Sequence, residues 1–209
     1  AEVPVAAPSG NTSGRPSPTT AAHMAEDMEG RIDAIVDGGP CSVGVESTIV
    51  DLTETPPRLL RPGGITLEQL ESVLGRVEVD QAVTRLMSAG EKPRAPGMKY
   101  RHYAPKAPVT VVAGPPERTA EHIARSLTPG DGVICFDEFA GEFPGCQIQR
   151  MGPAGDKSAQ ARHIFDALRA FDHTEVPRIW AQCPDPSGLG LAINNRLNKA
   201  AGFHIVEVK

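Results

Sequence analysis

The sequence predicts an α/β protein with two domains. Three observations support this prediction. The length of 209 residues suits one large or two small domains. Strand and helix patterns alternate through the second half of the chain. Between the halves, a stretch rich in Pro, Gly and cations breaks every periodicity. We therefore predict a first domain at residues 1–86, a linker at 87–107 and a second domain at 108–209.

The first 86 residues combine short β-branched or apolar runs with two helical patterns. Thr66 stands directly before one helical pattern, where a hydroxyl side chain can cap the first turn. The expected strands lie at residues 3–7, 31–39 and 47–53, and the expected helices at residues 18–30 and 66–75.

The second domain predicts a largely parallel sheet, because strands and helices follow each other in turn. The expected strands lie at residues 109–114, 131–138, 146–152, 177–183 and 203–208. The expected helices lie at residues 117–127, 158–173 and 189–202.

Composition excludes several classes of protein. A formal net charge of -5 argues against electrostatic binding of the whole protein to a nucleic-acid backbone. The low aromatic content of 4% argues against base-stacking platforms. The cysteines lie far apart without a C-x-x-C pair or a zinc-type histidine spacing, so we expect reduced thiols and no bound metal. No apolar run approaches a membrane span of about 20 residues and no signal-peptide pattern is present, so a cytoplasmic location is predicted.

Familiar nucleotide and hydrolase motifs are incomplete. The "GLGLA" stretch at 188–192 lacks the third glycine of a dinucleotide loop, and "AGPPER" at 113–118 lacks the Lys and Ser/Thr of a P-loop. The "GVEST" stretch at 44–48 is not the nucleophile elbow G-x-S-x-G.

A scattered set of polar residues on glycine- or proline-bordered turns remains. Taken singly, each is most simply a turn residue or a solvated side chain. Together they supply hydroxyl and amide groups that orient a substrate, and Arg and His groups that neutralise phosphate, which fits nucleotidyl transfer. The loop "PSGNTSG" also stands before a helix start, where anions bind. The set comprises Ser9, Asn11, Ser13, Ser47, Arg61, Arg101, His102 and Tyr103.

Four stretches in order carry a resemblance to a known family: "PVAAPSGNTSGRPSPT", "GVESTIVDL", "LLRPGGIT" and "APGMKYRHYAPKAPV". They resemble the two-domain form of the YrdC family, the threonylcarbamoyl-AMP synthases of tRNA modification. The resemblance implies part of a twisted YrdC-like sheet domain, a linker that reaches across its cavity, and a Rossmann-like α/β domain at residues 108–209. It also implies a reaction that joins L-threonine, bicarbonate and ATP, with Mg²⁺, into threonylcarbamoyl-AMP and pyrophosphate.

The resemblance also implies roles for residues of this chain. Ser9 and Asn11 would be catalytic and would bind nucleotide and threonyl groups, with Ser13 in the same loop. Ser47 and Arg61 would contact ATP phosphates or the threonine moiety. From the linker, His102 and Tyr103 would close the cavity.

Two departures from the family pattern stand out. Gly10 replaces the alanine usual between the Ser and the Asn, although both polar side chains remain. The family's Lys-x-Arg pair on an earlier strand has no counterpart here, so we expect a fragment that needs the missing N-terminal segment and is inactive alone.

Two other functions stay open. A non-catalytic nucleotide- or tRNA-binding regulatory fragment is one, and a carbamoyl-transfer relative of hydrogenase maturation proteins is the other. Proteins of a tRNA-modification complex are possible partners in the leading hypothesis.

Overall fold

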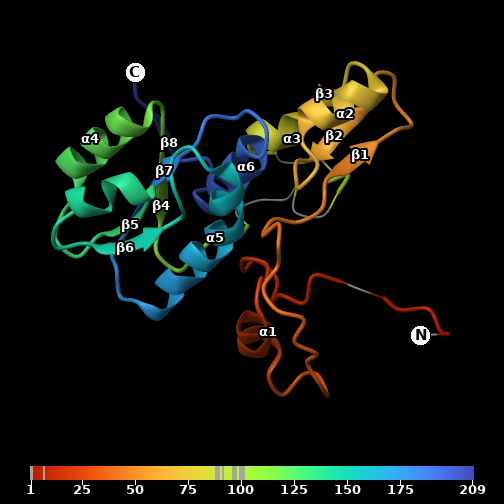
Figure 1. The fold of residues 1–209 in the computed structure, drawn as a ribbon, viewed down its shortest axis with the longest axis horizontal. Coiled ribbons are helices and arrows are strands. Elements are labelled where there is room, and N and C mark those ends of the chain that lie inside the picture. The colour runs from red at the N-terminus through yellow and green to blue at the C-terminus, as the bar shows by residue number, and fades with distance from the viewer. Residues whose placement is uncertain (1, 7, 88–89, 91, 96–97, 99–101) are drawn as a thin grey trace.

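Two β-sheets and the helices around them make up the protein (Figure 1). The computed structural model describes residues 2–6, 8–87, 90, 92–95, 98 and 102–209. The mixture of helices and a parallel sheet confirms the predicted α/β class.

The larger sheet has five parallel strands in the order β6-β5-β7-β4-β8. Its parallel pairing requires a crossover between successive strands, which the intervening helical segments provide. The strands are β4 (Val109–Ala113), β5 (Gly132–Cys135), β6 (Gln147–Arg150), β7 (Ile179–Cys183) and β8 (Ile205–Glu207), as the sequence predicts.

Helices cover both faces of this sheet. Because successive strand residues point to opposite faces, Val111 packs in the cluster that contains α5 and α6 residues, while Val112 packs with residues of α4. The predicted helices of this region are confirmed as α4 (Pro116–Ser126), α5 (Lys157–Ala170) and α6 (Gly190–Ala200). Two short 3₁₀ helices, η1 (Asp137–Glu142) and η2 (Phe171–His173), complete the connections.

The smaller sheet contains three short strands. β1 (Ile49–Asp51) runs antiparallel to β2 (Arg58–Arg61), which runs parallel to β3 (Glu78–Val79). The crossover from β2 to β3 is α2 (Leu67–Leu74), and α3 (Gln81–Thr84) follows β3. Thr66 caps α2 as predicted, in a reciprocal capping box with Gln69.

The first helix is α1 (Ala21–Met28), within the predicted range of residues 18–30. It begins after Thr20, whose side chain accepts a hydrogen bond from the His23 backbone N–H. Met24 of α1 also lies against Gly10, where a β-carbon would come within 2.5 Å of the Met24 side chain. Gly10 has φ 55°, so glycine suits both the backbone and the close approach.

Two predicted strands are absent from the described residues. Residues 3–6 and 31–39 have β-branched or apolar side chains but form no strand. Strands need a hydrogen-bonded neighbour, and neither segment pairs with another strand in the described part of the chain. Their side chains are open instead: Val5 is 76% exposed and Val36 is 94% exposed.

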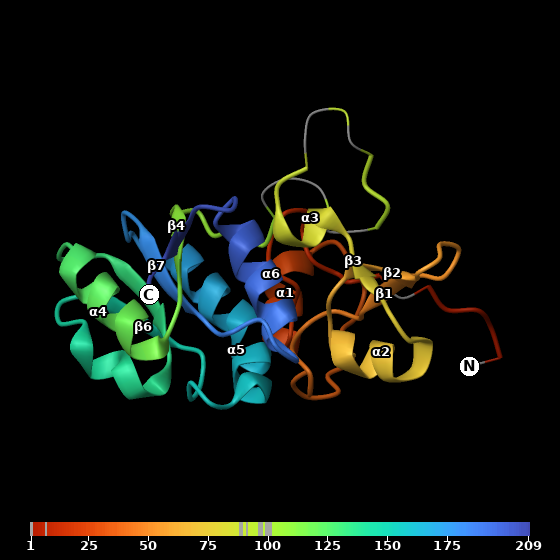
Figure 2. The same cartoon turned by 90° about the horizontal axis from the view of Figure 1, so that it is seen from above.

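Figure 2 shows α5 and α6 between the two sheets. These helices therefore face the core of the larger sheet on one side and the first half of the chain on the other. Among the described residues, no helix is both long and apolar enough to cross a membrane.

Candidate functional site

A buried arginine of α6 marks the meeting point of the two halves. The Arg196 side chain is fully buried, and its Nη2 lies 2.7 Å from Oε2 of Glu46. Its Nε also donates to Glu46 at 2.8 Å, and its Nη1 donates to the carbonyl of Pro62 at 2.8 Å. One guanidinium thus fixes two turns of the first half against α6.

Glu46 is the shared acceptor of this cluster. The Ser17 hydroxyl donates to its Oε1 at 2.7 Å, so the segment after the PSGNTSG loop is also hydrogen-bonded to this carboxylate. Burial alone would raise the pKa of Glu46, but the Arg196 charge and the Ser17 hydrogen bond hold it below its usual range. Glu46 is therefore a carboxylate at neutral pH.

Ser47 and Arg61 form a second pair next to Glu46. Arg61 Nε donates to the Ser47 carbonyl at 3.0 Å, and Nη2 donates to the Ser47 hydroxyl at 3.1 Å. Burial and the nearby Arg196 charge lower the pKa of Arg61 below its usual range. Nη1 of Arg61 has no hydrogen-bond partner among the described residues, so it is available to an anionic ligand.

The local sequence explains why these two turns stay together. Thr48 Oγ1 donates to the Ile65 carbonyl at 2.7 Å and accepts from the Ile65 N–H at 3.0 Å. A β-carbon on Gly63 would lie 2.2 Å from the Glu46 carbonyl oxygen, so only glycine permits this approach. The motifs GVEST and LRPGG are therefore one structural unit.

His102 and Tyr103 join the same cluster from the opposite side. The Tyr103 ring lies 5.7 Å from the Arg196 guanidinium carbon and 5.2 Å from the Phe165 ring, and the residue is 2% exposed. Burial raises the pKa of Tyr103 to about 12. Tyr103 is therefore anchored in the core around α5 and α6 through its ring contacts.

His102 packs edge-on against Tyr103, with ring centroids 4.1 Å apart. Its backbone N–H donates to the Lys199 carbonyl at 3.3 Å, and its buried Nδ1 has no partner within the described structure. Burial lowers the pKa of His102, and the charges of Lys199, Arg196 and Arg61 lower it further. A neutral imidazole is better suited to hydrogen bonding than to the charge neutralisation that the sequence suggested.

Ser9, Asn11 and Ser13 of the PSGNTSG loop make no hydrogen bond to the Glu46 cluster in the described structure. Ser9 Oγ donates to Asn11 Oδ1 at 2.6 Å, and Asn11 Nδ2 donates to the carbonyls of Thr12 and Arg15 in its own loop. Ser13 is exposed. Within the described residues, no hydrogen bond, ion pair or ring contact joins Ser9, Asn11 or Ser13 to the Glu46 cluster.

A buried ion pair holds this loop and α1 against the second half. Arg169 of α5 donates from Nη2 to Asp27 Oδ2 at 2.6 Å, and Arg15 Nη1 donates to Asp27 Oδ1 at 2.8 Å. The side chains of Asp27 and Arg169 are 0% and 2% exposed. The loop is therefore fixed at its Arg15 end, although Ser9 itself is exposed.

The sequence analysis singled out several residues of this cluster but not the two at its centre, Glu46 and Arg196. Ser47, Arg61, His102 and Tyr103 gather around Glu46 and Arg196, whereas Arg101 lies outside the described residues. Glu46 stood inside a quoted motif, and Arg196 stood on the apolar face of a predicted helix, where a charge needs a buried partner.

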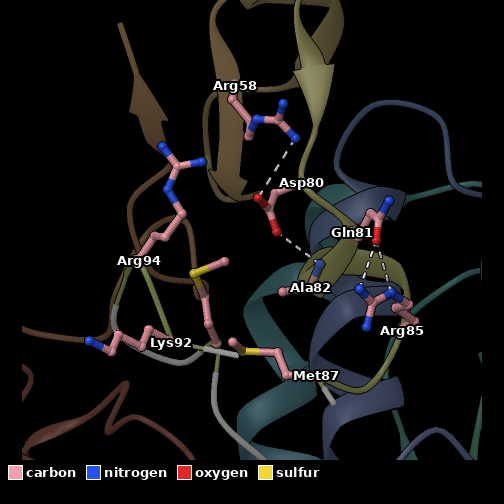
Figure 3. Close-up of a pocket in the computed structure, with 9 residues that line it drawn as sticks. Arg58, Asp80, Gln81, Ala82, Arg85, Met87, Lys92 and Arg94 are labelled. Carbon is pink, nitrogen blue, oxygen red and sulfur yellow. Dashed lines mark hydrogen bonds and ion pairs between the residues drawn. The ribbon is translucent and has the colours of Figure 1, made fainter. Parts of the chain in front are cut away.

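A cavity of about 260 Å³ lies between the smaller sheet and described residues of the predicted linker. Figure 3 shows the residues that line it. Arg58 and Arg94 line it, yet both are ion-paired: Arg58 with Glu54 at 2.6 Å and Arg94 with Glu54 at 2.6 Å. This cavity shares no lining residue with the Glu46 cluster, and two of its cations, Arg58 and Arg94, already have an acidic partner. In the described parts of the chain, no group of three or more His, Cys, Asp or Glu is placed to hold a metal ion.

Known families match nearly the whole chain. Residues 65–202 match the family described as "Threonylcarbamoyl-AMP synthase, C-terminal domain". The chain belongs to the threonylcarbamoyl-AMP synthase family. Residues 1–63 match a second family, described as "Telomere recombination". The family resemblance seen in the sequence is therefore confirmed.

Curated relatives carry the same name. The threonylcarbamoyl-AMP synthase of Bacillus subtilis is 46% identical over 98% of this chain and 59% of its own length. That of Pyrococcus abyssi is 46% identical over 99% of this chain and 60% of its own length. The chain thus spans about three fifths of the relatives it matches.

Two solved structures of P. abyssi Sua5 share the fold. One, complexed with L-threonine, is 42% identical, with a TM-score of 0.80 over 97% of this chain and 59% of that chain. The other is a variant in which a histidine and the next tyrosine are replaced by alanine. It is also 42% identical, with a TM-score of 0.87 over 96% of this chain and 58% of that chain.

Proposed function

We propose that the protein acts in threonylcarbamoyl-AMP synthesis, joining L-threonine, bicarbonate and ATP with release of pyrophosphate. The observation that carries the proposal is the Arg61 guanidinium, which Ser47 orients at the edge of the Glu46 cluster. It supplies a fixed positive charge where a family member needs phosphate neutralised. The similarity to curated synthases over nearly all of this chain supports the same reaction.

The proposed roles follow from the chemistry of each group. Arg61 binds a phosphate or carboxylate oxygen through its available Nη1, and Ser47 holds it in place. His102, kept neutral by burial, offers a hydrogen bond from the predicted linker, while Tyr103 anchors that segment against Arg196 and Phe165. His102 and Tyr103 are the one His-Tyr dipeptide of the chain, and the P. abyssi variant replaces such a pair.

We place Ser9 and Asn11 at the nucleotide and threonyl end of the same site. The Ser9–Asn11 hydrogen bond gives the loop a fixed shape, and Arg15 and Asp27 hold its far end. No protein carboxylate of the cluster is free for a metal, because Glu46 is used by Arg196 and Ser17. This donor set fits Mg²⁺ that arrives on the phosphates of ATP and supplies further charge neutralisation there.

The experiment compares Arg61→Ala with Arg76→Ala. Both arginines lie in the first half, but the Arg76 side chain is 78% exposed and pairs only with Glu78 among the described residues. ATP binding is measured by calorimetry, and pyrophosphate release is measured with and without threonine and bicarbonate. We expect Arg61→Ala to weaken ATP binding at least tenfold and Arg76→Ala to leave it unchanged.

The outcomes separate the two candidate functions. Pyrophosphate release that requires both threonine and bicarbonate supports the synthase. ATP binding that depends on Arg61 without such release supports a nucleotide-binding fragment that is not catalytic by itself. Equal ATP binding by both variants and the unaltered protein would remove Arg61 from the site.

A further inference from the structure

A second cavity lies on the far side of α6, at the carboxyl ends of β4 and β7. Its volume is about 450 Å³, within the range of about 300–1,000 Å³ typical of small-molecule sites. Ala113 and Gly114 line it from the end of β4, and Cys183 lines it from the end of β7. None of its lining residues belongs to the Glu46 cluster, although Asn195 accepts a hydrogen bond from Arg196 Nη1 at 3.1 Å.

The topology of the larger sheet places a ligand crevice at this point. β4 and β7 are neighbours, but the chain leaves β4 towards β5 on one side and leaves β7 towards β8 on the other. The two crossover helices lie on opposite faces, because α4 residues pack with Val112 and α6 residues pack with Val111. In open parallel sheets, ligands bind outside the strand ends where the order reverses in this way.

Two asparagines of α6 give this cavity a specific polar surface. Asn198 Oδ1 is buried and has no hydrogen-bond partner in the described structure. Asn194 accepts from the Cys183 thiol at 2.9 Å through Oδ1, which leaves its Nδ2 to donate elsewhere. A buried acceptor without a partner costs free energy unless a ligand or water satisfies it.

The charge of the cavity disfavours phosphate. Asp185 and Glu207 line it, and the lining residues include no Lys or Arg. Asp185 is paired with Lys157 at 2.7 Å, so Glu207 supplies the uncompensated negative charge. The start of α6 is also occupied, since the Gly188 N–H donates to Glu68 Oε1 at 3.0 Å. A carboxylate of α2 thus takes a position where such folds often hold a phosphate.

The remaining features suit a flat, uncharged ring that carries a sugar. Apolar side chains of Val83, Leu191 and Ile205 line the walls. Asparagine amides pair well with the adjacent donor and acceptor of adenine, and an exposed carboxylate such as Glu207 can accept from ribose hydroxyls. We propose that this cavity binds an uncharged purine nucleoside, independently of the proposed ATP site.

The test measures binding of adenosine, AMP and Mg-ATP to the whole chain by calorimetry and ligand-observed NMR. At this cavity we expect adenosine to bind better than AMP, and AMP better than ATP, because each phosphate meets the Glu207 carboxylate. The proposed Arg61 site should show the opposite order.

Three variants assign the binding to its site. Asn198→Leu should weaken adenosine binding at least tenfold and leave ATP binding at the Arg61 site unchanged. Arg61→Ala should leave adenosine binding unchanged. Because Asn198→Leu could disturb folding, Glu207→Lys on the exposed end of β8 provides a second test, in which AMP should now bind better than adenosine.

Adenosine binding that is lost in Arg61→Ala but retained in Asn198→Leu would overturn the inference. So would failure of the unaltered chain to bind adenosine, or an unchanged preference in Glu207→Lys. Each of these results leaves the proposed synthase function standing, since that function depends on ATP and threonine binding near Arg61.

Discussion

Arg196 of α6 and Glu46 of the first half form a buried ion pair, with 2.7 Å between Nη2 and Oε2. Their side chains are 0% and 13% exposed. The pair joins parts of the chain 150 residues apart, and the residues after Glu46 hold Arg61. The position of the proposed phosphate-binding arginine therefore depends on the packing of a helix in the other half.

Replacing Arg196 should destabilise the protein strongly. Arg196→Met leaves Glu46 buried without its cation, which typically costs about 3–5 kcal/mol. We expect this loss in the free energy of unfolding, measured by urea denaturation followed by circular dichroism. Arg118→Met is the matched control, because its side chain is 57% exposed and pairs with Glu121 on the surface of α4. If the two variants unfold at the same urea concentration, the pair does not hold the halves together.

The same ion pairs predict how stability depends on pH. The pKa values of Glu46 and Asp27 are held below their ordinary values of 4.5 and 3.8, against burial, by Arg196 and Arg169. A carboxylate with a lowered folded-state pKa stabilises the protein above the unfolded pKa, and this contribution is lost as pH falls through the folded pKa. We expect the free energy of unfolding to fall steadily from about pH 5 downward.

Asp27→Asn should reduce this pH dependence as well as stability at neutral pH. Unfolding in urea at several pH values between about 6 and 3 measures both effects. Asp33→Asn, at an exposed position in the segment after α1, serves as the control. An identical pH slope in the unaltered protein and in Asp27→Asn would show that the Asp27–Arg169 pair carries none of it.

Local sequence patterns predicted most of the second domain because the hydrophobic periodicity and secondary-structure propensity of its segments match the structure they adopt. The three inner strands of the larger sheet, β5, β7 and β4, are mostly apolar and buried between helices, so periodicity and β-propensity agree there. Thr66 and Thr20 mark helix starts by chemistry that is visible in the sequence. The runs around Val5 and Val36 failed as strands because propensity cannot supply a hydrogen-bonded neighbour.

The site was harder to predict because its centre depends on contacts between distant residues. Ser47 and Arg61 could be chosen from motifs. Arg196 could not, because its contacts with Glu46 and Pro62 form only when α6 packs against residues 46–62. His102 was predicted as a site residue and lies beside Tyr103 and Lys199, yet its protonation depends on burial and on three neighbouring cations that the sequence does not place. Lys199, one of those cations, was not singled out at all.

Lys199 provides a test of how these charges affect stability. Its side chain is buried, and Nζ donates to the Met98 carbonyl at 3.1 Å. Burial and the Arg196 charge lower the pKa of Lys199 to about 8. Between about pH 8 and its unfolded value of 10.5, the unfolded chain binds more protons than the folded one, so stability should rise with pH.

Lys199→Met should therefore stabilise the protein at pH 7, by about 1–3 kcal/mol, and should remove the rise in stability above pH 8. The methionine keeps the apolar contacts of the lysine stem but carries no buried charge. Urea unfolding at about pH 7 and pH 10 measures both effects, with the exposed Lys209→Met as the control. A loss of stability at pH 7 would mean that the Nζ–Met98 hydrogen bond outweighs the cost of burying the charge. A rise above pH 8 that persists in Lys199→Met would show that another group causes it.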